Sequence, residues 1–303
     1  MTANRKKGKP KKDFIDYFKH DSKRKAKHVT FTDYSTSPGN AFLKYSREAK
    51  DAVEYFRNNV KKLKKHKIKF KQDDADASLE LIVISFLPSL MGHFVTYQKH
   101  LFAGIFEMSI FLKSFDEKSF IKMLQDAKSS ESTGNGSIKL DAISLCSYRN
   151  FQPEHSGLKS FVGLYLADNL PGWHDPIKVN NYFKAFGFST DFFNNEDCKE
   201  LKVLWQLRHS IVHTGGTLTR PDSQKVSTLR NLSGKTIVFE DNFIWIFARK
   251  IQQIIHTSSQ RLETAFFNDL VSNVSSEETK RMKIFFEAKG ITWNNNPKKK
   301  KVS

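Results

Sequence analysis

The stretch NNEDCKELKVLWQLRHSIVHTGG, residues 194–216, predicts a helix with a clear beginning and a clear end. Asn194 or Asn195 can cap its first turn, and acidic residues follow at once, where the positive end of the helix dipole favours them. Gly215 and Gly216 then stop the helix. The residues that share one face are Leu201, Leu204, Trp205, Arg208, Ile211 and Val212. An amphipathic helix of this kind packs against other helices, so we expect a helical domain.

The segments on both sides of this stretch also repeat apolar residues every three or four positions, which is the period of a helix. The helices that we expect are residues 41–71, one or two helices within 74–114, then 117–128, 179–186, 241–273 and 276–289. Within the turn-rich segment 217–240, KTIVF (residues 235–239) has strand character. The sequence therefore predicts a mainly α fold, an antiparallel helical bundle with a small β-hairpin insert and basic terminal tails.

The two ends of the chain are expected to lie outside this bundle. Residues 1–40 are lysine-rich, end in the turn-like SPGN of residues 37–40, and predict a basic mobile arm. Residues 41–290 predict a single helical domain, and residues 291–303 a lysine-rich tail. The basic N-terminus is not followed by the apolar core and cleavage site of a secretory signal, so we expect a cytoplasmic protein.

The net charge of +18 is concentrated in three short segments: residues 1–30, residues 57–71 and the tail Lys298–Lys301. The rest of the chain is close to neutral. Concentrated lysines suit a polyanion, because each one near a phosphate releases counterions. The candidate RNA-binding residues are Lys61, Lys62, Lys64, Lys65, Lys67, Lys69 and Lys71. A solvated charge run and a membrane surface are the alternative interpretations.

The most apolar stretch, residues 81–97, contains no Asp, Glu, Lys or Arg. Its length touches the lower limit for a membrane span. Pro88 and Gly92 interrupt it, so we interpret it as two buried helices or one helix kinked at Pro88. A membrane-associated protein remains the alternative.

Only two cysteines occur, Cys146 and Cys198, and neither has the spacing to histidines that zinc ligands have. The sequence therefore excludes a disulfide scaffold and a four-cysteine zinc site. We expect no metal and no cofactor.

The end of the predicted helix within residues 194–216 reads RHSIVHTGG (residues 208–216), and it contains Arg208 and His213 with four residues between them. It resembles the signature of the HEPN superfamily, helical bundles in which an Arg, four to six residues and a His form a metal-independent ribonuclease site. His209 matches the polar residue that often follows the Arg, and the glycine break also fits. The resemblance covers about residues 75–270. Two other Arg–His pairs, Arg149–His155 and Arg249–His256, lack this context.

The residues themselves suit RNA cleavage, because RNA carries its own nucleophile, the 2′-hydroxyl. A histidine such as His213 can accept that proton near neutral pH. An Arg fork such as that of Arg208 matches two phosphate oxygens. The expected products carry a 2′,3′-cyclic phosphate and a 5′-hydroxyl.

Arg208 and His213 lie about 140° apart on an ideal helix, so one straight helix does not bring them together. Either the last turn unwinds, or two subunits meet, and the resemblance implies a homodimer with a composite site. His209 lies about 40° from His213. It can orient His213, contact RNA, or simply sit exposed near the helix end.

We therefore expect an endoribonuclease of the toxin or anti-phage defence type, which the resemblance implies, with RNA as its substrate. An antitoxin or another defence-system protein is the partner that the family suggests. The main alternative is a non-catalytic HEPN-type module that binds RNA or assembles a complex.

Overall fold

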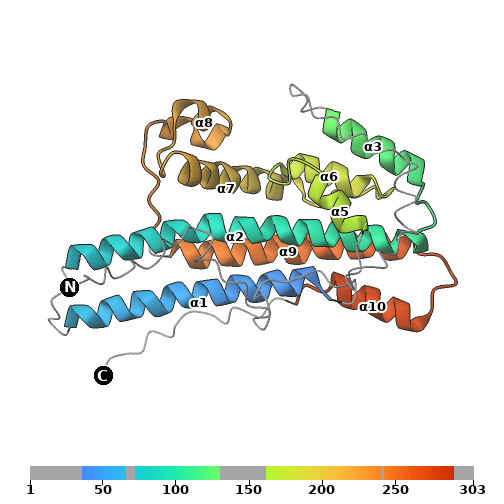
Figure 1. Cartoon of the computed structure of the whole chain (residues 1–303), viewed down its shortest axis with the longest axis horizontal. Coiled ribbons are helices and arrows are strands. Elements are labelled where there is room, and N and C mark those ends of the chain that lie inside the picture. Colours follow the sequence, from blue (N-terminus) through green and yellow to red (C-terminus); the bar gives the residue numbers. More distant parts are fainter. Residues whose placement is uncertain (1–35, 66–71, 130–161, 241, 290–303) are drawn as a thin grey trace, which may run out of the picture. The chain divides into compact units, whose positions relative to one another are not determined.

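The computed structural model describes residues 36–65, 72–129, 162–240 and 242–289, all within the unit Phe31–Ser303 (Figure 1). The helices are α1 Pro38–Lys65, α2 Gln72–Met108, α3 Glu117–Ser129, α5 Val162–Asn169, α6 Pro176–Lys184, α7 Asn195–His213, α8 Arg220–Gln224, α9 Phe243–Asn268 and α10 Ser276–Phe286, with two 3₁₀ turns, η2 Ser109–Phe111 and η3 Ser227–Leu232. The described residues are thus mainly α, as predicted.

The start of α1 lies earlier than predicted, because SPGN is a helix cap and not a free turn. The Ser37 hydroxyl accepts a hydrogen bond from the Asn40 N–H at 2.9 Å, as an N-cap residue does. Pro38 takes the first helical position, where its missing N–H costs nothing. The rest of the predicted arm, residues 1–35, and the predicted tail, from residue 290 on, lie outside the described residues.

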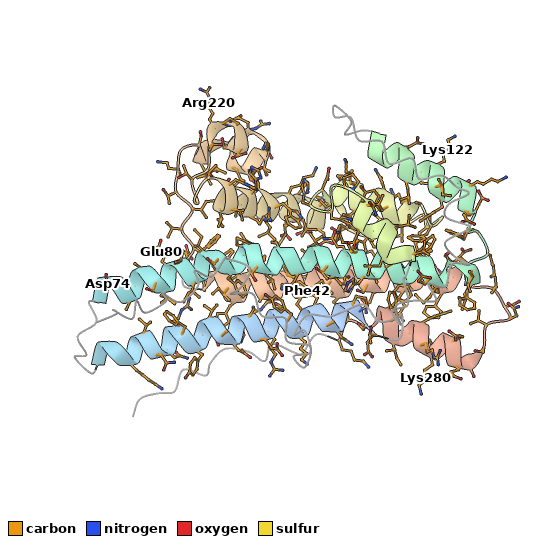
Figure 2. The ribbon with its side chains drawn as sticks, viewed as in Figure 1. Phe42, Asp74, Glu80, Lys122, Arg220 and Lys280 are labelled. Carbon is orange, nitrogen blue, oxygen red and sulfur yellow. The ribbon has the colours of Figure 1, made fainter. Side chains whose placement is uncertain are left out.

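The long helices α1, α2 and α9 run side by side (Figure 1). Phe42, which Figure 2 labels, lies near the start of α1, and its ring centroid is 5.8 Å from that of Phe94 in the second half of α2. Tyr45, later in α1, bonds to Ser89, earlier in α2, so these two helices run in opposite directions. By contrast, Phe86 of α2 meets Phe247 of α9, and Tyr97 further along α2 bonds to Ser259 further along α9. Helices α2 and α9 therefore run in the same direction.

Helix α2 is continuous through Pro88, so of the two predicted alternatives the division into two helices is wrong, and the region forms a single helix. The segment Asp74–Phe111 is long and apolar enough to cross a membrane by length and composition, which is weak evidence, since the core helix of a soluble protein passes the same test. Several α2 side chains, among them Met91, Phe94 and Phe102, have no exposed surface.

Phenylalanines fill most of the space between the helices. Phe102 and Phe106 of α2 pack against Phe120 of α3, and Phe186, just after α6, packs against both Phe102 and Phe120. The ring centroids of these pairs lie 4.9–6.1 Å apart in stacked and tilted arrangements, within the range of distances that aromatic pairs prefer. Other phenylalanines lie elsewhere in the same core, so the buried interior uses many of the 27 Phe of the chain.

The first turn of α7 is held by three neighbours. Asn194 caps it by accepting from the Asp197 N–H at 2.7 Å, as the sequence predicts. Asn180 of α6 pairs with the backbone N–H and carbonyl of Phe193. Arg261 of α9 donates to the Phe192 carbonyl and to the Asp197 carboxylate, at 2.8 and 2.9 Å. This anchoring fixes where the helix points.

The predicted β-hairpin between α7 and α9 is replaced by two short helices, α8 and η3. An isolated antiparallel bridge between Thr217 and Thr236 joins the two ends of this segment, and the described residues contain no strand. The apolar residues of KTIVF do alternate, since Ile237 is buried and Val238 is exposed. Within the described residues, the segment forms a single bridge, supported by hydrogen bonds from the Leu218 N–H to the Lys235 carbonyl and from the Ile237 N–H to the Gly216 carbonyl, and a single bridge is too short to make a strand. We call residues 217–240 the insert.

Candidate functional site

The C-terminal end of α7 is well defined. The helix continues through His213, and the N–H groups of Thr214 and Gly216 both donate to the Ser210 carbonyl, at 3.0 Å. Gly215 and Gly216 have φ angles of 61° and 86°, a region that favours glycine. These two residues turn the chain away from the helix, so His213 is its last residue.

Arg208 and His213 are not brought together within one chain. Because α7 stays helical through His213, the two side chains leave the axis about 140° apart. The last turn therefore does not unwind before His213, which removes one of the two ways of joining the pair. Among the described residues, no hydrogen bond or ion pair links them.

Arg208 is half-buried, and its Nε has no hydrogen-bond partner among the described residues. The same holds for Gln206 Nε2 and Ser210 Oγ, on the same helix. A buried donor without a partner costs stability, and such groups are rare in native proteins. This part of α7 therefore carries unused hydrogen-bonding capacity.

His209 and His213 do lie together. Their ring centroids are 4.6 Å apart, with 42° between the ring planes, as the spacing of four residues allows on a helix. The His209 side chain is 44% exposed, and His213 is exposed as well. The two imidazoles thus form an accessible pair at the end of α7, the histidine pair below.

A carboxylate from the insert faces this pair. Asp222 of α8 places its Oδ1 3.7 Å from His209 Nε2, and its side chain is 8% exposed. The same Oδ1 accepts a hydrogen bond from Lys225 Nζ at 2.9 Å, and Oδ2 accepts one from the Thr219 hydroxyl at 2.8 Å. Thr219 also caps α8, so the short helix holds the carboxylate in place.

These contacts shift the pKa values of both groups. Partial burial lowers the pKa of His209; the carboxylate of Asp222 opposes this, while Lys225, His213 and Arg208 act in the same direction as burial. The hydrogen bond from Lys225 is the largest cause that holds the pKa of Asp222 below its usual value, with help from Thr219 and against burial. At neutral pH, Asp222 is therefore a carboxylate and His209 is mostly uncharged.

The predicted RNA-binding lysines are described only in part. Lys62 is exposed on α1, and Lys61, Lys64 and Lys65 lie on the last turns of the same helix. Lys67, Lys69 and Lys71 lie outside the described residues.

The lysine-bearing end of α1 lies at the same end of the helices as the end of α7. Arg57 of α1, the first turns of α2 up to Ile84, and residues 237–239 of the insert line one cavity of about 270 Å³. Gly216, just after α7, lies against the Ile84 side chain. Both α1, at Arg57, and the insert, at residues 237–239, therefore lie next to the first turns of α2.

The other residues considered from the sequence are structural or lie elsewhere. Cys198 is a buried thiol whose pKa is raised by that burial. Of the other Arg–His pairs, Arg149–His155 lies outside the described residues, while His256 Nδ1 contacts the Ala288 carbonyl at 3.1 Å. Within the described part of the chain, His, Cys, Asp and Glu form no group that could hold a metal ion.

Sequence reasoning missed Asp222 and Lys225. The available signal is local: Thr219 and Asp222 form the T-x-x-D pattern of a capped helix start, with Pro221 in the first turn. That pattern predicts α8, but it does not predict that α8 lies against His209.

Comparison with known proteins gives no relative: no family model, no curated protein and no solved structure matches the chain.

Proposed function

We propose that the chain is a metal-independent endoribonuclease of the HEPN type, acting in a toxin or anti-phage defence role in the cytoplasm. The observation that carries the proposal is the exposed histidine pair at the glycine-terminated end of α7, which also carries Arg208. In this proposal, the antiparallel bundle of that family consists of α1, α2, α7 and α9. Each of these helices runs opposite to the next one along the chain, so α2 and α9 run in the same direction.

The reaction uses only groups that the chain and RNA supply. His213 accepts the proton of a 2′-hydroxyl, and the 2′-oxygen forms a bond to phosphorus. The bond from phosphorus to the 5′-oxygen breaks, and that oxygen takes up a proton from the protonated imidazole of the histidine pair, so the products carry a 2′,3′-cyclic phosphate and a 5′-hydroxyl. Arg208 stabilises the charge on the phosphate oxygens, and His209 supports His213.

Because Arg208 and His213 diverge within one chain, the proposal includes a two-fold dimer. In a two-fold interface the same surface faces itself, so Arg208 of one chain can meet His213 of the other. The lysines at the end of α1 then hold the RNA backbone.

The test is cleavage of total cellular RNA in EDTA by the wild type and by Arg208→Ala and His213→Ala. Arg249→Ala is the matched control, because Arg249 is an exposed arginine on another helix. We expect cleavage by the wild type and the control, a loss of about 100-fold or more in the two site variants, and cyclic phosphate ends. Equal cleavage by all four proteins would reject the proposal.

The divergence of Arg208 and His213 favours a second candidate, a non-catalytic module that binds RNA or assembles a complex with a partner such as an antitoxin. This candidate predicts salt-dependent RNA binding without turnover, unchanged by His213→Ala. The length and apolar composition of α2 allow a third candidate, a membrane-associated protein. Purification of the protein as a dimer without detergent would exclude this candidate.

A further inference from the structure

One oxygen atom of Asp222 lies close to two side chains, the ammonium of Lys225 and the imidazole of His209. Its Oδ1 accepts a hydrogen bond from Lys225 Nζ at 2.9 Å and lies 3.7 Å from His209 Nε2. Lys225 follows α8 directly as its C-cap residue, whereas His209 lies on α7, and the Asp222 carboxylate contacts both side chains. Asp222 therefore connects the insert to the histidine pair.

The Asp222 carboxylate is buried and hydrogen-bonded at both oxygens, unlike the carboxylate of an ordinary surface ion pair. Asp222 is 8% exposed, and burying a charge is costly unless hydrogen bonds compensate for it. Both of its oxygens are used, Oδ1 by Lys225 and Oδ2 by the Thr219 hydroxyl. The Lys225 side chain remains 57% exposed even though its Nζ is bonded to this carboxylate.

This arrangement also supplies what Arg208 does not. The Arg208 side chain leaves α7 about 140° away from that of His213. Lys225, by contrast, lies on the same side of α7 as the histidines, because Lys225 and His209 both contact Oδ1 of Asp222. An ammonium with three donors is a good ligand for a phosphate oxygen. The remaining donors of Lys225 are free to bind one while Asp222 keeps the side chain in position.

We propose that Asp222 is a positioning residue that holds His209 and Lys225 together, and that Lys225 binds a phosphate of the RNA next to the histidine pair. The proposal rests on the proposed ribonuclease function for its substrate. The insert is then part of the site and not only a connection between α7 and α9.

The first test uses inorganic phosphate as the probe and does not depend on activity. Histidine ring signals of the full-length protein are followed by NMR during a phosphate titration, and His209→Gln and His213→Gln assign them. We expect phosphate to shift both signals in the wild type, and Lys225→Met to weaken phosphate binding about tenfold. Lys235→Met, which removes an exposed lysine elsewhere in the insert, should bind like the wild type.

The second readout is the pKa of His209 in the same spectra. The charged and titratable groups that act on His209 are Asp222, Lys225, His213 and Arg208. Asp222→Asn removes the group that raises this pKa, so the pKa should fall, and Asp222→Glu should restore it in part. A purely structural role for Asp222 would leave the pKa unchanged in a folded variant.

The outcomes separate this proposal from the one on which it rests. Phosphate binding that is absent, or that is unchanged in Lys225→Met, overturns the role of Lys225. An unchanged His209 pKa in Asp222→Asn overturns the role of Asp222; if that variant does not fold, Lys225→Met, which leaves the carboxylate in place, decides. Should both readouts succeed while RNA stays intact in EDTA, the ribonuclease proposal fails and the phosphate site stands.

Discussion

Arg261 of α9 is hydrogen-bonded to Asp197 in the first turn of α7, with 2.9 Å between Nη2 and the carboxylate Oδ2. The pair is largely withdrawn from water, since the side chain of Asp197 is 8% exposed and that of Arg261 is 26% exposed. It ties the beginning of the site-bearing helix to the neighbouring long helix.

Arg261→Met should therefore destabilise the protein by about 2–4 kcal/mol, because it leaves a buried carboxylate without its cation. Urea unfolding followed by circular dichroism measures this loss. Arg281→Met is the control, since Arg281 pairs with Glu277 and Glu278 in an exposed ion pair and should cost less than about 0.5 kcal/mol. Equal losses in both variants would contradict the anchoring role of Arg261.

Gly163 marks a close approach of α5 to α2. A Cβ at this position would lie 2.5 Å from the Ala103 carbonyl oxygen, which belongs to the backbone and cannot move aside easily. Gly163→Ala should therefore cost about 1–3 kcal/mol through overpacking. At Gly92, inside α2, a Cβ would meet nothing within 4 Å, so Gly92→Ala should stabilise by up to about 1 kcal/mol. Thermal unfolding of the two variants would show shifts of opposite sign, and a shared sign would refute the packing argument.

His100 makes the fold sensitive to acid. Burial lowers its pKa to about 4, against the opposing charge of Asp168. The unfolded chain takes up a proton on this residue near pH 6.5, whereas the folded protein does so only near pH 4. The free energy of unfolding should therefore fall as the pH drops from about 6.5 towards 4, by at most about 3 kcal/mol from this group.

His100→Gln should remove this share of the pH dependence and flatten the curve between pH 7 and pH 4, as measured by urea unfolding at several pH values. His174→Gln is the control, because His174 is exposed. A variant curve as steep as that of the wild type would assign the acid sensitivity to other groups.

The parts of the fold that depend on local signals could be predicted from the sequence. Asn194 caps α7 and Gly215–Gly216 end it, because a cap and a positive-φ turn each involve only a few neighbouring residues. At Ser37–Asn40 the local signal is ambiguous, since Ser-Pro begins a helix as readily as it makes a turn, and the predicted turn is a helix cap. Only the continuation of the apolar pattern into α1 distinguishes the two.

The parts that depend on distant contacts could not be predicted. The alternating residues of KTIVF suggest a strand, but a strand requires a partner over several residues, and in the part of the chain that the structure describes this segment forms the single bridge between Thr236 and Thr217. The position of Asp222 beside His209 likewise depends on how α8 folds back onto α7. Sequence spacing did predict that Arg208 and His213 diverge and that His209 and His213 share one side of the helix, because helix geometry alone decides both.

The central claim, a ribonuclease site shared between two chains, is tested most directly by mixing two inactive variants. Arg208→Ala and His213→Ala are unfolded together, refolded at equal concentration and assayed for RNA cleavage in EDTA. Half of the dimers should contain one of each chain, and each of these has one intact site, so the mixture should regain roughly a quarter of the wild-type rate. A mixture no more active than either variant alone, beside an active wild type, would contradict the shared site.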